Sequence, residues 1–397
     1  MKLSKRISQI KPSPTLAITA KANSLRAEGR DIIGFGAGEP DFDTPESIKR
    51  AAIKAIEAGF TKYTPVGGTD DLKDAIISKL QRDHGLIYKR SEVAVSCGAK
   101  HTLYNLAQVL FEDGDEVLIP APYWVSYVDI ITLTGAKPVI IETNVADGFK
   151  LQPEQLLKAI NERTRAIIIN SPSNPTGINY GRAELESLAV ILAEKDTLII
   201  SDDIYEKIIY DGGKFYSMAA LSPALKKNFI LVNGVSKAYA MTGWRIGYAA
   251  GPEEIIAALV KLQSQSTSNP TSIAQKAAVE ALNGPQESVT AMTQEFEKRR
   301  NAIVAMLNAI PGVTCIMPDG AFYVFPDVSS FYGRNYESKV IANSSDLTAF
   351  LLENANVAVV PGVEFGHDSH IRLSYAIAMN HIEEGLKRIK QALLKLA

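Results

Sequence analysis

Cysteine is scarce in this chain, and its two cysteines lie far apart. Cys97 and Cys315 are the only ones among 397 residues, and neither belongs to a Cys-x-x-Cys pair or to a mixed cluster with histidine. Structural zinc sites and disulfide frameworks need several such residues at short spacing, so neither is supported. We expect two buried, reduced thiols, as in a protein of a reducing compartment.

A strong net charge is also lacking. The chain has 42 Lys and Arg against 44 Asp and Glu, which gives a formal net charge of −2. No block of like charges suggests a binding tail. Nucleic-acid-binding proteins usually carry a clear positive excess on one face. The sequence therefore gives no reason to expect a nucleic-acid partner.

Long hydrophobic runs are missing, although 46% of the residues are hydrophobic. A membrane-spanning helix needs about 18 or more consecutive apolar residues, and no such run occurs. The N-terminus, MKLSKRISQIKPSP, lacks the apolar centre of a secretory signal. We therefore expect no membrane association and a cytoplasmic location.

The middle of the chain contains short, continuous apolar runs that alternate with helical patterns such as those at 101–111 and 182–194. The runs are Glu92–Ser96, Glu116–Pro120, Pro138–Ile141, Ala166–Asn170, Thr197–Ser201, Phe229–Asn233 and Gly247–Ala250. Continuous apolar strands are typical of sheets that are covered on both faces. This alternation predicts an α/β fold with a mostly parallel central sheet.

The C-terminal part has a different pattern, with short strands and helices interleaved. The expected strands are Ala321–Pro326, Val357–Val360 and His370–Tyr375, and the expected helices are Leu347–Asn354 and His381–Leu396. A chain of this length exceeds the size at which single cores stop growing. We expect a large domain at 46–290 and a smaller α+β domain formed by 1–45 with 291–397. Segment 335–343 resembles an insertion, and we assign it no chemical role.

Ligands of open parallel sheets bind at the carboxyl ends of the strands, so the residues that follow each run are candidates for a site. The turn Gly98-Ala99-Lys100 opens a helix whose free N–H groups could hold a phosphate, although a glycine at such a turn is also ordinary loop chemistry. The motif SPSNPTG forms a rigid turn that leaves the Asn174 amide free to point into a cleft.

Two ionisable residues follow the next predicted strands. Asp202 could hold a ring nitrogen in its protonated form, or it could cap a helix. Lys237 follows an apolar run, lies among small residues and precedes Arg245 by eight positions. Desolvation and a nearby cation lower the pKa of a lysine and make it a usable amine. An amine, a carboxylate, amide donors and a phosphate cradle are together what pyridoxal 5′-phosphate (PLP) requires.

These features occur within longer motifs, and through them the chain resembles the fold-type I aminotransferases. Within that family it is similar to the prokaryotic aspartate aminotransferases of class I, subgroup Ib. The motifs are GAGEPDFDTP, TKYTPVGG, APYWVSY, NSPSNPTG, SDDIYE, VSKAYAMTGWRIGY, GAFYVF and HIRLSYA. The resemblance runs almost end to end. It implies the PLP-dependent transferase fold, a homodimer with shared active sites, and ping-pong transfer of an amino group from L-aspartate to 2-oxoglutarate.

The resemblance also implies roles for individual residues at the cofactor ring. Lys237 is implied to be the Schiff-base lysine and the base that moves the substrate proton. Asp202 would pair with the pyridinium nitrogen. Asn174 and Tyr205 would hydrogen-bond the phenolic oxygen, and Trp124 would stack on the ring.

The implied phosphate and substrate sites are larger and draw on distant parts of the chain. The phosphate site comprises Gly98, Ala99, Lys100, Ser236, Arg245 and, from the second subunit, Tyr63. The substrate site comprises Gly38, Trp124, Asn174 and Arg372, with Lys100, Lys11 and Thr15 as candidates for a distal carboxylate. Arg372 would bind the α-carboxylate with two parallel hydrogen bonds, which suits a planar guanidinium.

Substrate choice is left open by the sequence, because Arg372 would recognise any α-carboxylate. Prephenate as amino acceptor and aromatic amino acids as donors are alternatives on the same scaffold. A PLP-sensing regulatory domain is a more remote alternative. Such regulators carry a DNA-binding segment ahead of this region, whereas here the match begins within the first dozen residues.

Two other motifs receive ordinary explanations. GFGAGEP does not have the GxGxxG spacing of a dinucleotide-binding loop, and Pro40 follows where a helix should continue. His367 and His370 in GHDSH have no third ligand nearby in sequence. We therefore expect solvated loop histidines and no metal site.

Overall fold

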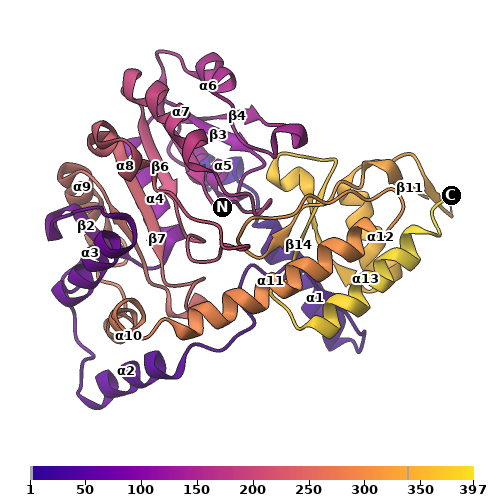
Figure 1. Cartoon of the computed structure of the whole chain (residues 1–397), viewed down its shortest axis with the longest axis horizontal. Coiled ribbons are helices and arrows are strands. Elements are labelled where there is room, and N and C mark those ends of the chain that lie inside the picture. The colour runs from indigo at the N-terminus through magenta and orange to yellow at the C-terminus, as the bar shows by residue number, and fades with distance from the viewer. Residues whose placement is uncertain (1–2, 338) are drawn as a thin grey trace.

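The computed structural model describes residues 3–337 and 339–397, and a seven-stranded sheet forms its centre (Figure 1). The strand order is β2-β8-β7-β6-β5-β3-β4. The strands are β2 Val93–Ser96, β3 Glu116–Ala121, β4 Lys137–Glu142, β5 Thr164–Asn170, β6 Leu198–Asp202, β7 Phe229–Gly234 and β8 Gly247–Ala250. Strands β4, β3, β5, β6 and β7 are parallel to their neighbours in that order, whereas β8 is antiparallel to both β7 and β2. The predicted mostly parallel sheet is confirmed.

Both faces of this sheet are covered, which explains why its strands are continuously apolar. In β5, Ile167 and Ile169 belong to one hydrophobic core, and Ala166 and Ile168 belong to the core on the opposite face. The first face is covered by α3 (Asp70–His84), α7 (Arg182–Glu194) and α10 (Ser272–Asn283), and the second by α4 (Ala99–Leu110), α5 (Ser126–Thr132) and α9 (Glu253–Ser264). Each fully buried isoleucine contributes about 2 kcal/mol to folding.

The C-terminal part surrounds a separate hydrophobic core. Its elements are α11 (Glu287–Asn308), β9 (Tyr323–Val324), α12 (Ser344–Ala355), β12 (Val357–Ala358), β13 (Val360–Pro361), β14 (Ile371–Ser374) and α13 (Met379–Leu393). Strand β14 lies between β13 and β9, and Figure 1 shows the long α11 running from the sheet region toward α12 and α13. The predicted domain boundary near residue 290 falls inside α11, and the division into two domains stays a prediction.

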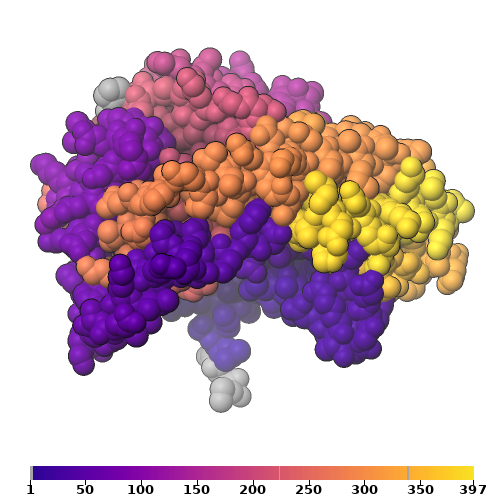
Figure 2. All heavy atoms as spheres, turned by 60° about the horizontal axis from the view of Figure 1, so that its bottom comes forward, coloured from indigo at the N-terminus to yellow at the C-terminus, as the bar shows by residue number. Residues whose placement is uncertain are grey.

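The N-terminal segment joins this C-terminal part rather than the central sheet. Strand β1 (Ile33–Gly34) pairs in parallel with β12. Ahead of it lie η1 (Lys5–Gln9), which buries no residue, and α1 (Pro14–Ala27). Figure 2 shows the indigo start of the chain projecting from the body of the molecule. The pairing of β1 with β12 brings residues 36–39 close to β14.

Segment 335–343 forms a small hairpin from β10 (Asn335–Tyr336) and β11 (Lys339–Val340). Asn335 exchanges two backbone hydrogen bonds with Ala397, with N···O distances of 2.8 and 3.0 Å. The insertion therefore anchors the C-terminal end of the chain. None of its described residues lines the cavity discussed below.

The expectation of solvated loop histidines was wrong for His370, which is only 2% exposed. Its ring stacks on Phe325 at 4.8 Å, and the His367 ring meets it edge-on at 4.5 Å. The reason is that β14 begins at Ile371, directly after His370, so that His370 is held against the core. The expectation for the cysteines holds for Cys315, which is buried, whereas Cys97 is half-buried.

The remaining helices are α2 (Glu46–Glu57), α6 (Pro153–Ala159) and α8 (Met218–Leu221). Among the described residues, no helix is both long enough and apolar enough to cross a bilayer.

Candidate active site

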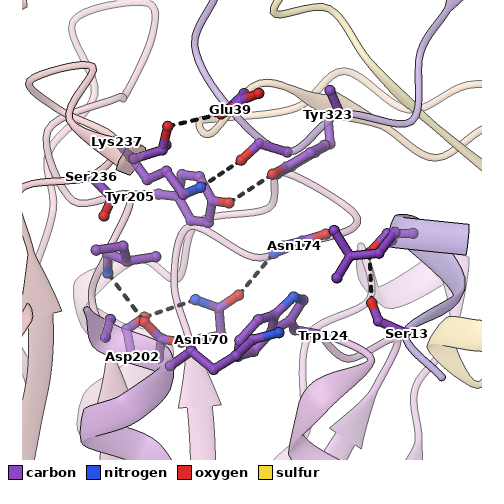
Figure 3. Close-up of a pocket in the computed structure, with 18 of the residues that line it drawn as sticks. Ser13, Glu39, Trp124, Asn170, Asn174, Asp202, Tyr205, Ser236, Lys237 and Tyr323 are labelled. Carbon is purple, nitrogen blue, oxygen red and sulfur yellow. Dashed lines mark hydrogen bonds between the residues drawn. The ribbon is translucent and has the colours of Figure 1, made fainter. Parts of the chain in front are cut away.

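A cavity of about 580 Å³ opens at the carboxyl ends of the parallel strands (Figure 3). Its walls come from the ends of β5 and β6, from the turn after β7, from the N-terminal segment and from β14. Most of the predicted site residues line it: Thr15, Gly38, Ala99, Lys100, Trp124, Asn174, Asp202, Tyr205, Ser236, Lys237, Arg245 and Arg372. The structure therefore brings these residues together around one cavity, and their individual roles stay predictions.

Lys237 lies in the turn after β7 with its amine facing the N-terminal segment (Figure 3). Its Nζ donates a hydrogen bond to the Gly38 carbonyl oxygen. The pKa of Lys237 is lowered to about 8, chiefly by burial; the Glu39 charge opposes this shift, and the positive charges of Arg245 and Arg372 add to it. A lysine with this pKa is partly neutral near physiological pH, so its nitrogen lone pair is available for reaction.

Asp202 ends β6 and is 4% exposed. Its Oδ2 accepts a hydrogen bond of 2.7 Å from the Tyr127 hydroxyl, and its Oδ1 accepts one of 3.3 Å from the Ile204 backbone N–H. Burial raises the pKa of Asp202 to about 6. Within the described part of the chain it forms no ion pair with any basic side chain. A buried carboxylate of this kind is stabilised by a cation that enters the cavity.

A chain of hydrogen bonds connects the end of β6 to β14. The Asn170 side-chain amide donates to the Asp202 carbonyl oxygen at 2.8 Å, and its Oδ1 accepts from the Asn174 backbone N–H at 2.8 Å. Arg372 donates to Asn174 Oδ1 at 3.0 Å and to the Gly36 carbonyl oxygen at 2.7 Å. The sheet, the N-terminal segment and β14 therefore share one network of hydrogen bonds.

Arg372 is 1% exposed and lies between two aromatic rings. Its guanidinium carbon is 4.6 Å from the centre of the Tyr323 ring and 5.0 Å from that of Phe365. Its buried Nε has no hydrogen-bond partner among the described residues. The Tyr323 hydroxyl lies 2.8 Å from the Tyr205 hydroxyl. This fixed guanidinium with an unused donor fits a carboxylate ligand.

The opposite end of the cavity fits a phosphate. Helix α4 begins at Ala99, and the backbone N–H groups of Ala99 and Lys100 have no backbone acceptor among the described residues. Gly98 has a φ of +92°, and a Cβ added there would lie 2.3 Å from an Arg245 nitrogen. Only glycine allows Arg245 to approach the helix N-terminus this closely. Ser236 lines the same cavity. Free N–H groups, a guanidinium and a hydroxyl together form an anion site.

A family model described as "Aminotransferase class I and II" matches residues 30–389, which include this whole set except Thr15. The chain belongs to this family. Its enzymes depend on PLP, and so does this aminotransferase. The residues present fit the cofactor. A cradle that a Cβ would obstruct would hold the phosphate, and a buried carboxylate that forms no ion pair with the described residues would pair with the ring nitrogen.

Curated relatives and solved structures match the aminotransferase over nearly its whole length. An aspartate aminotransferase from Bacillus subtilis is 51% identical, with 98% of each chain covered. An aspartate/prephenate aminotransferase from Nitrosomonas europaea is 51% identical, with 99% of this chain and 100% of the relative covered. The structure of the aspartate aminotransferase from Rhizobium meliloti superposes with a TM-score of 0.97 at 47% identity, with both chains fully covered.

Three predicted residues lie outside the cavity of the aminotransferase. Gly98 lies directly behind the cradle, where it makes room for Arg245. Tyr63 is 91% exposed. Lys11 is exposed and lies near Asp129, where its backbone N–H and its charge partly offset the rise in the pKa of Asp129 that burial causes.

Sequence reasoning missed several residues that line the cavity, and the polar ones among them include Ser13, Glu39, Tyr127, Asn170 and Tyr323. The signals for them were present. Tyr127 and Tyr323 occur in the motifs APYWVSY and GAFYVF, and Asn170 is the last residue of a predicted strand.

Proposed function

We propose that this aminotransferase transfers the amino group of L-aspartate to 2-oxoglutarate by a ping-pong mechanism. The observation that carries the substrate assignment is that Lys100 lines the cavity in addition to Arg372 and to Arg245 and Lys237, which the cofactor would engage. The Lys100 Nζ lies 4.9 Å from the centre of the Trp124 ring. Lys100 and Arg372 together suit a substrate with two carboxylates. A related enzyme from Thermus thermophilus, 41% identical with a TM-score of 0.92, was solved with maleate, which is a dicarboxylate.

Hydroxyl groups on the N-terminal segment add polar contacts to that wall. Ser13 Oγ and Thr15 Oγ1 lie 3.1 Å apart, and both residues line the cavity. We propose that Lys100 and Thr15, with Ser13, bind the distal carboxylate of the substrate. Lys11 remains a candidate for that role, because it lies on the same N-terminal segment, two positions before Ser13 and four before Thr15.

When bound, PLP supplies an aldehyde that takes up the amino group and a ring that withdraws electrons from the substrate α-carbon. Asp202 would hold a proton on the ring nitrogen, and Asn174 and Tyr205 would donate to or share a proton with the phenolic oxygen. Trp124 would cover one face of the ring. The backbone of Gly98, Ala99 and Lys100, together with Ser236 and Arg245, would hold the phosphate.

Arg372 would bind the α-carboxylate of the substrate and so fix its orientation. Asn174 and the Gly38 backbone would complete that contact, because Asn174 already bonds Arg372 and Gly38 lines the same wall. Lys237, with a pKa near 8, would take the proton from the substrate α-carbon and deliver it to the cofactor carbon; it would move the proton the opposite way in the second half-reaction. A base whose pKa is close to the working pH is efficient in both directions.

We also propose that the enzyme is a cytoplasmic homodimer in which Tyr63 binds the phosphate of the partner's site. The support is the exposure of the Tyr63 ring, since a tyrosine that is 91% exposed contributes nothing to the fold of its own chain. Tyrosine is enriched in protein interfaces, where its ring packs and its hydroxyl finds a polar partner.

Prephenate is a second candidate amino acceptor. It is also a dicarboxylate, so the same two cations would suit it. The Nitrosomonas europaea relative, named for aspartate and prephenate, is as similar to this chain as the Bacillus subtilis relative named for aspartate alone.

The visible absorption spectrum of the purified holoenzyme tests the proposal. L-Aspartate added without any oxo acid is expected to convert the aldehyde form of the cofactor to its amine form. 2-Oxoglutarate added next is expected to restore the aldehyde form, and prephenate in its place tests the second acceptor. A cofactor band that does not respond to aspartate but responds to an aromatic amino acid would overturn the substrate assignment and leave the aminotransferase assignment intact.

A further inference from the structure

Tyr127 contacts two of the residues that are proposed to bind the cofactor ring, Asp202 and Trp124. Its hydroxyl donates to Asp202 Oδ2 at 2.7 Å. Its ring meets the Trp124 ring edge-on, with centres 5.3 Å apart and planes at 82°. Its backbone N–H donates to the Trp124 carbonyl oxygen at 3.0 Å. One side chain therefore connects the Asp202 carboxylate with the Trp124 indole, which appear on either side of Asn170 in Figure 3.

The position of Tyr127 is itself tightly constrained. The residue lies in the first turn of α5 and is 3% exposed. Burial and the neighbouring Asp202 raise the pKa of the Tyr127 phenol well above its ordinary value, so the hydroxyl keeps its proton and remains a donor. An edge-on aromatic contact adds about 1 kcal/mol beyond buried area, which resists movement of either ring.

Asp202 has few other contacts that fix its carboxylate. Its backbone is held by β6 and by the Asn170 amide, but within the described part of the chain its side chain receives only one further hydrogen bond, the 3.3 Å contact from the Ile204 N–H. Without the Tyr127 hydroxyl, one carboxylate oxygen would lose its shorter hydrogen bond and the side chain could rotate. A rotated carboxylate would meet the cofactor ring nitrogen in the wrong direction.

We propose that Tyr127 is a positioning residue that fixes the Asp202 carboxylate and the Trp124 indole in one arrangement, ready for the cofactor ring. This inference rests on the proposed roles of Asp202 and Trp124. The Tyr127 hydroxyl would influence the ring nitrogen of the cofactor through Asp202. The Tyr127 ring would influence stacking on the cofactor by holding Trp124 in place. These two functions separate cleanly in variants, because phenylalanine keeps the ring and loses only the hydroxyl.

The test is a comparison of two cofactors that differ at one ring atom. Dissociation constants are measured for PLP and for 1-deazapyridoxal 5′-phosphate, in which a C–H group replaces the ring nitrogen. Tyr127→Phe is expected to weaken PLP about tenfold, the effect of one hydrogen bond to a charged group, and to change the deaza cofactor by less than about twofold. Tyr127→Leu, which also removes the edge-on ring, is expected to weaken both cofactors.

Tyr180→Phe is the matched control. Tyr180 is also buried, and its hydroxyl makes one 2.8 Å hydrogen bond, to the Leu151 N–H, outside the main cavity. It is expected to leave both dissociation constants unchanged. If Tyr127→Phe does not fold, 4-aminophenylalanine and 4-methylphenylalanine at position 127 fill similar space with and without a donor. The amino variant is then expected to bind PLP about tenfold more tightly than the methyl variant.

Equal weakening of both cofactors by Tyr127→Phe, or no weakening of either, would overturn the inference. In an Asp202→Asn background, Tyr127→Phe is expected to cause little further loss of PLP affinity, and fully additive losses would also contradict it. The proposed function fails separately, because a wild-type protein that binds neither cofactor would show no cofactor absorbance at all.

Discussion

Two buried carboxylates at or just beyond the end of β6, Asp202 and Glu206, have opposite surroundings. Asp202 faces the cavity, has no cation in contact among the described residues, and has a pKa raised to about 6 by burial. Glu206, four residues later, faces away from the cavity into a cluster of charged side chains. Its carboxylate contacts the Lys79 ammonium and lies 2.6 Å from the His84 ring nitrogen. These partners hold the pKa of Glu206 well below its ordinary value, despite equal burial.

The difference separates a functional site from a structural one. The charged cluster comprises Lys79, Asp83, His84, Glu206 and Lys207, and its charges neutralise one another. Asp83, His84 and Glu206 lie close enough to resemble metal ligands, but the Lys79 ammonium already contacts both carboxylates. In the cavity, in contrast, neither Asp202, Lys237 nor Arg372 forms a salt bridge with any residue that the structure describes. Groups left in this state are available for a ligand.

The largest expected effect in the cavity follows from Lys237→Ala. We expect the variant to fold normally and to lose transamination by more than about 10⁴-fold, because both the amine and the proton-transferring base are removed. Steady-state kinetics and the visible spectrum of the variant would measure this. Turnover near the wild-type rate would mean that the cavity is not the active site, and the contrast with the charged cluster would lose its basis.

Glu206→Ala is expected to give the largest effect in the charged cluster. It would leave the buried Lys79 ammonium without its closest partner and reduce the free energy of unfolding by about 3–5 kcal/mol. Activity per folded molecule is expected to remain close to that of the wild type. Urea denaturation would measure the loss of stability, and active-site titration would measure the activity per folded molecule. Glu186→Ala, which breaks the exposed ion pair with Arg182, is the matched control and should cause no measurable change.

Arg372→Ala is expected to reduce kcat/KM by about 100-fold for every amino acid, mainly through KM, because a buried guanidinium bonded to Asn174 and Gly36 is lost. Arg372→Lys keeps the charge but not the forked geometry and is expected to recover only part of the loss. Kinetics with aspartate, glutamate and an aromatic amino acid provide the comparison. A loss confined to dicarboxylic substrates would place Arg372 at the distal carboxylate instead.

The sequence predicted the site residues that come directly after a strand or belong to a known motif. Lys237, Asp202 and Asn174 each follow a continuous apolar run, and parallel strands bring their carboxyl ends to one edge. An apolar run is visible in a few consecutive residues, so the predicted strands agreed closely with the structure. The strand Gly247–Ala250 and the helix Arg182–Glu194 have the bounds that the sequence predicted.

The sequence could not predict contacts made across long separations. The Tyr127 hydroxyl meets Asp202 across 75 residues, and Tyr205 meets Tyr323 across 118. No local pattern encodes such pairs, since they depend on how whole elements pack. His370 shows the same limit, because its polar neighbours in GHDSH suggested a solvated loop while Phe325 and Phe149 cover its ring. The charged cluster was also missed, because Lys79 and Glu206 are far apart in the chain.

The smallest and most discriminating prediction concerns the PLP-free protein. Because the folded-state pKa of Asp202, about 6, lies above the unfolded value of roughly 3.9, ionisation of Asp202 destabilises the fold as pH rises through this interval. Asp202→Asn is therefore expected to raise the free energy of unfolding at pH 8 by on the order of 2–3 kcal/mol, and the gain should vanish below about pH 4.

Glu206 is expected to show the opposite trend with pH. Its folded-state pKa is depressed, so the stability it contributes is present at neutral pH and is lost as pH falls below the unfolded value of roughly 4.3. Urea midpoints of the PLP-free wild type, Asp202→Asn and Glu206→Ala between pH 4 and 8 would place the two trends side by side. An Asp202→Asn variant that is less stable than the wild type at pH 8 would show that Asp202 is a structural carboxylate like Glu206. Cofactor binding would then no longer explain why Asp202 lies in the cavity.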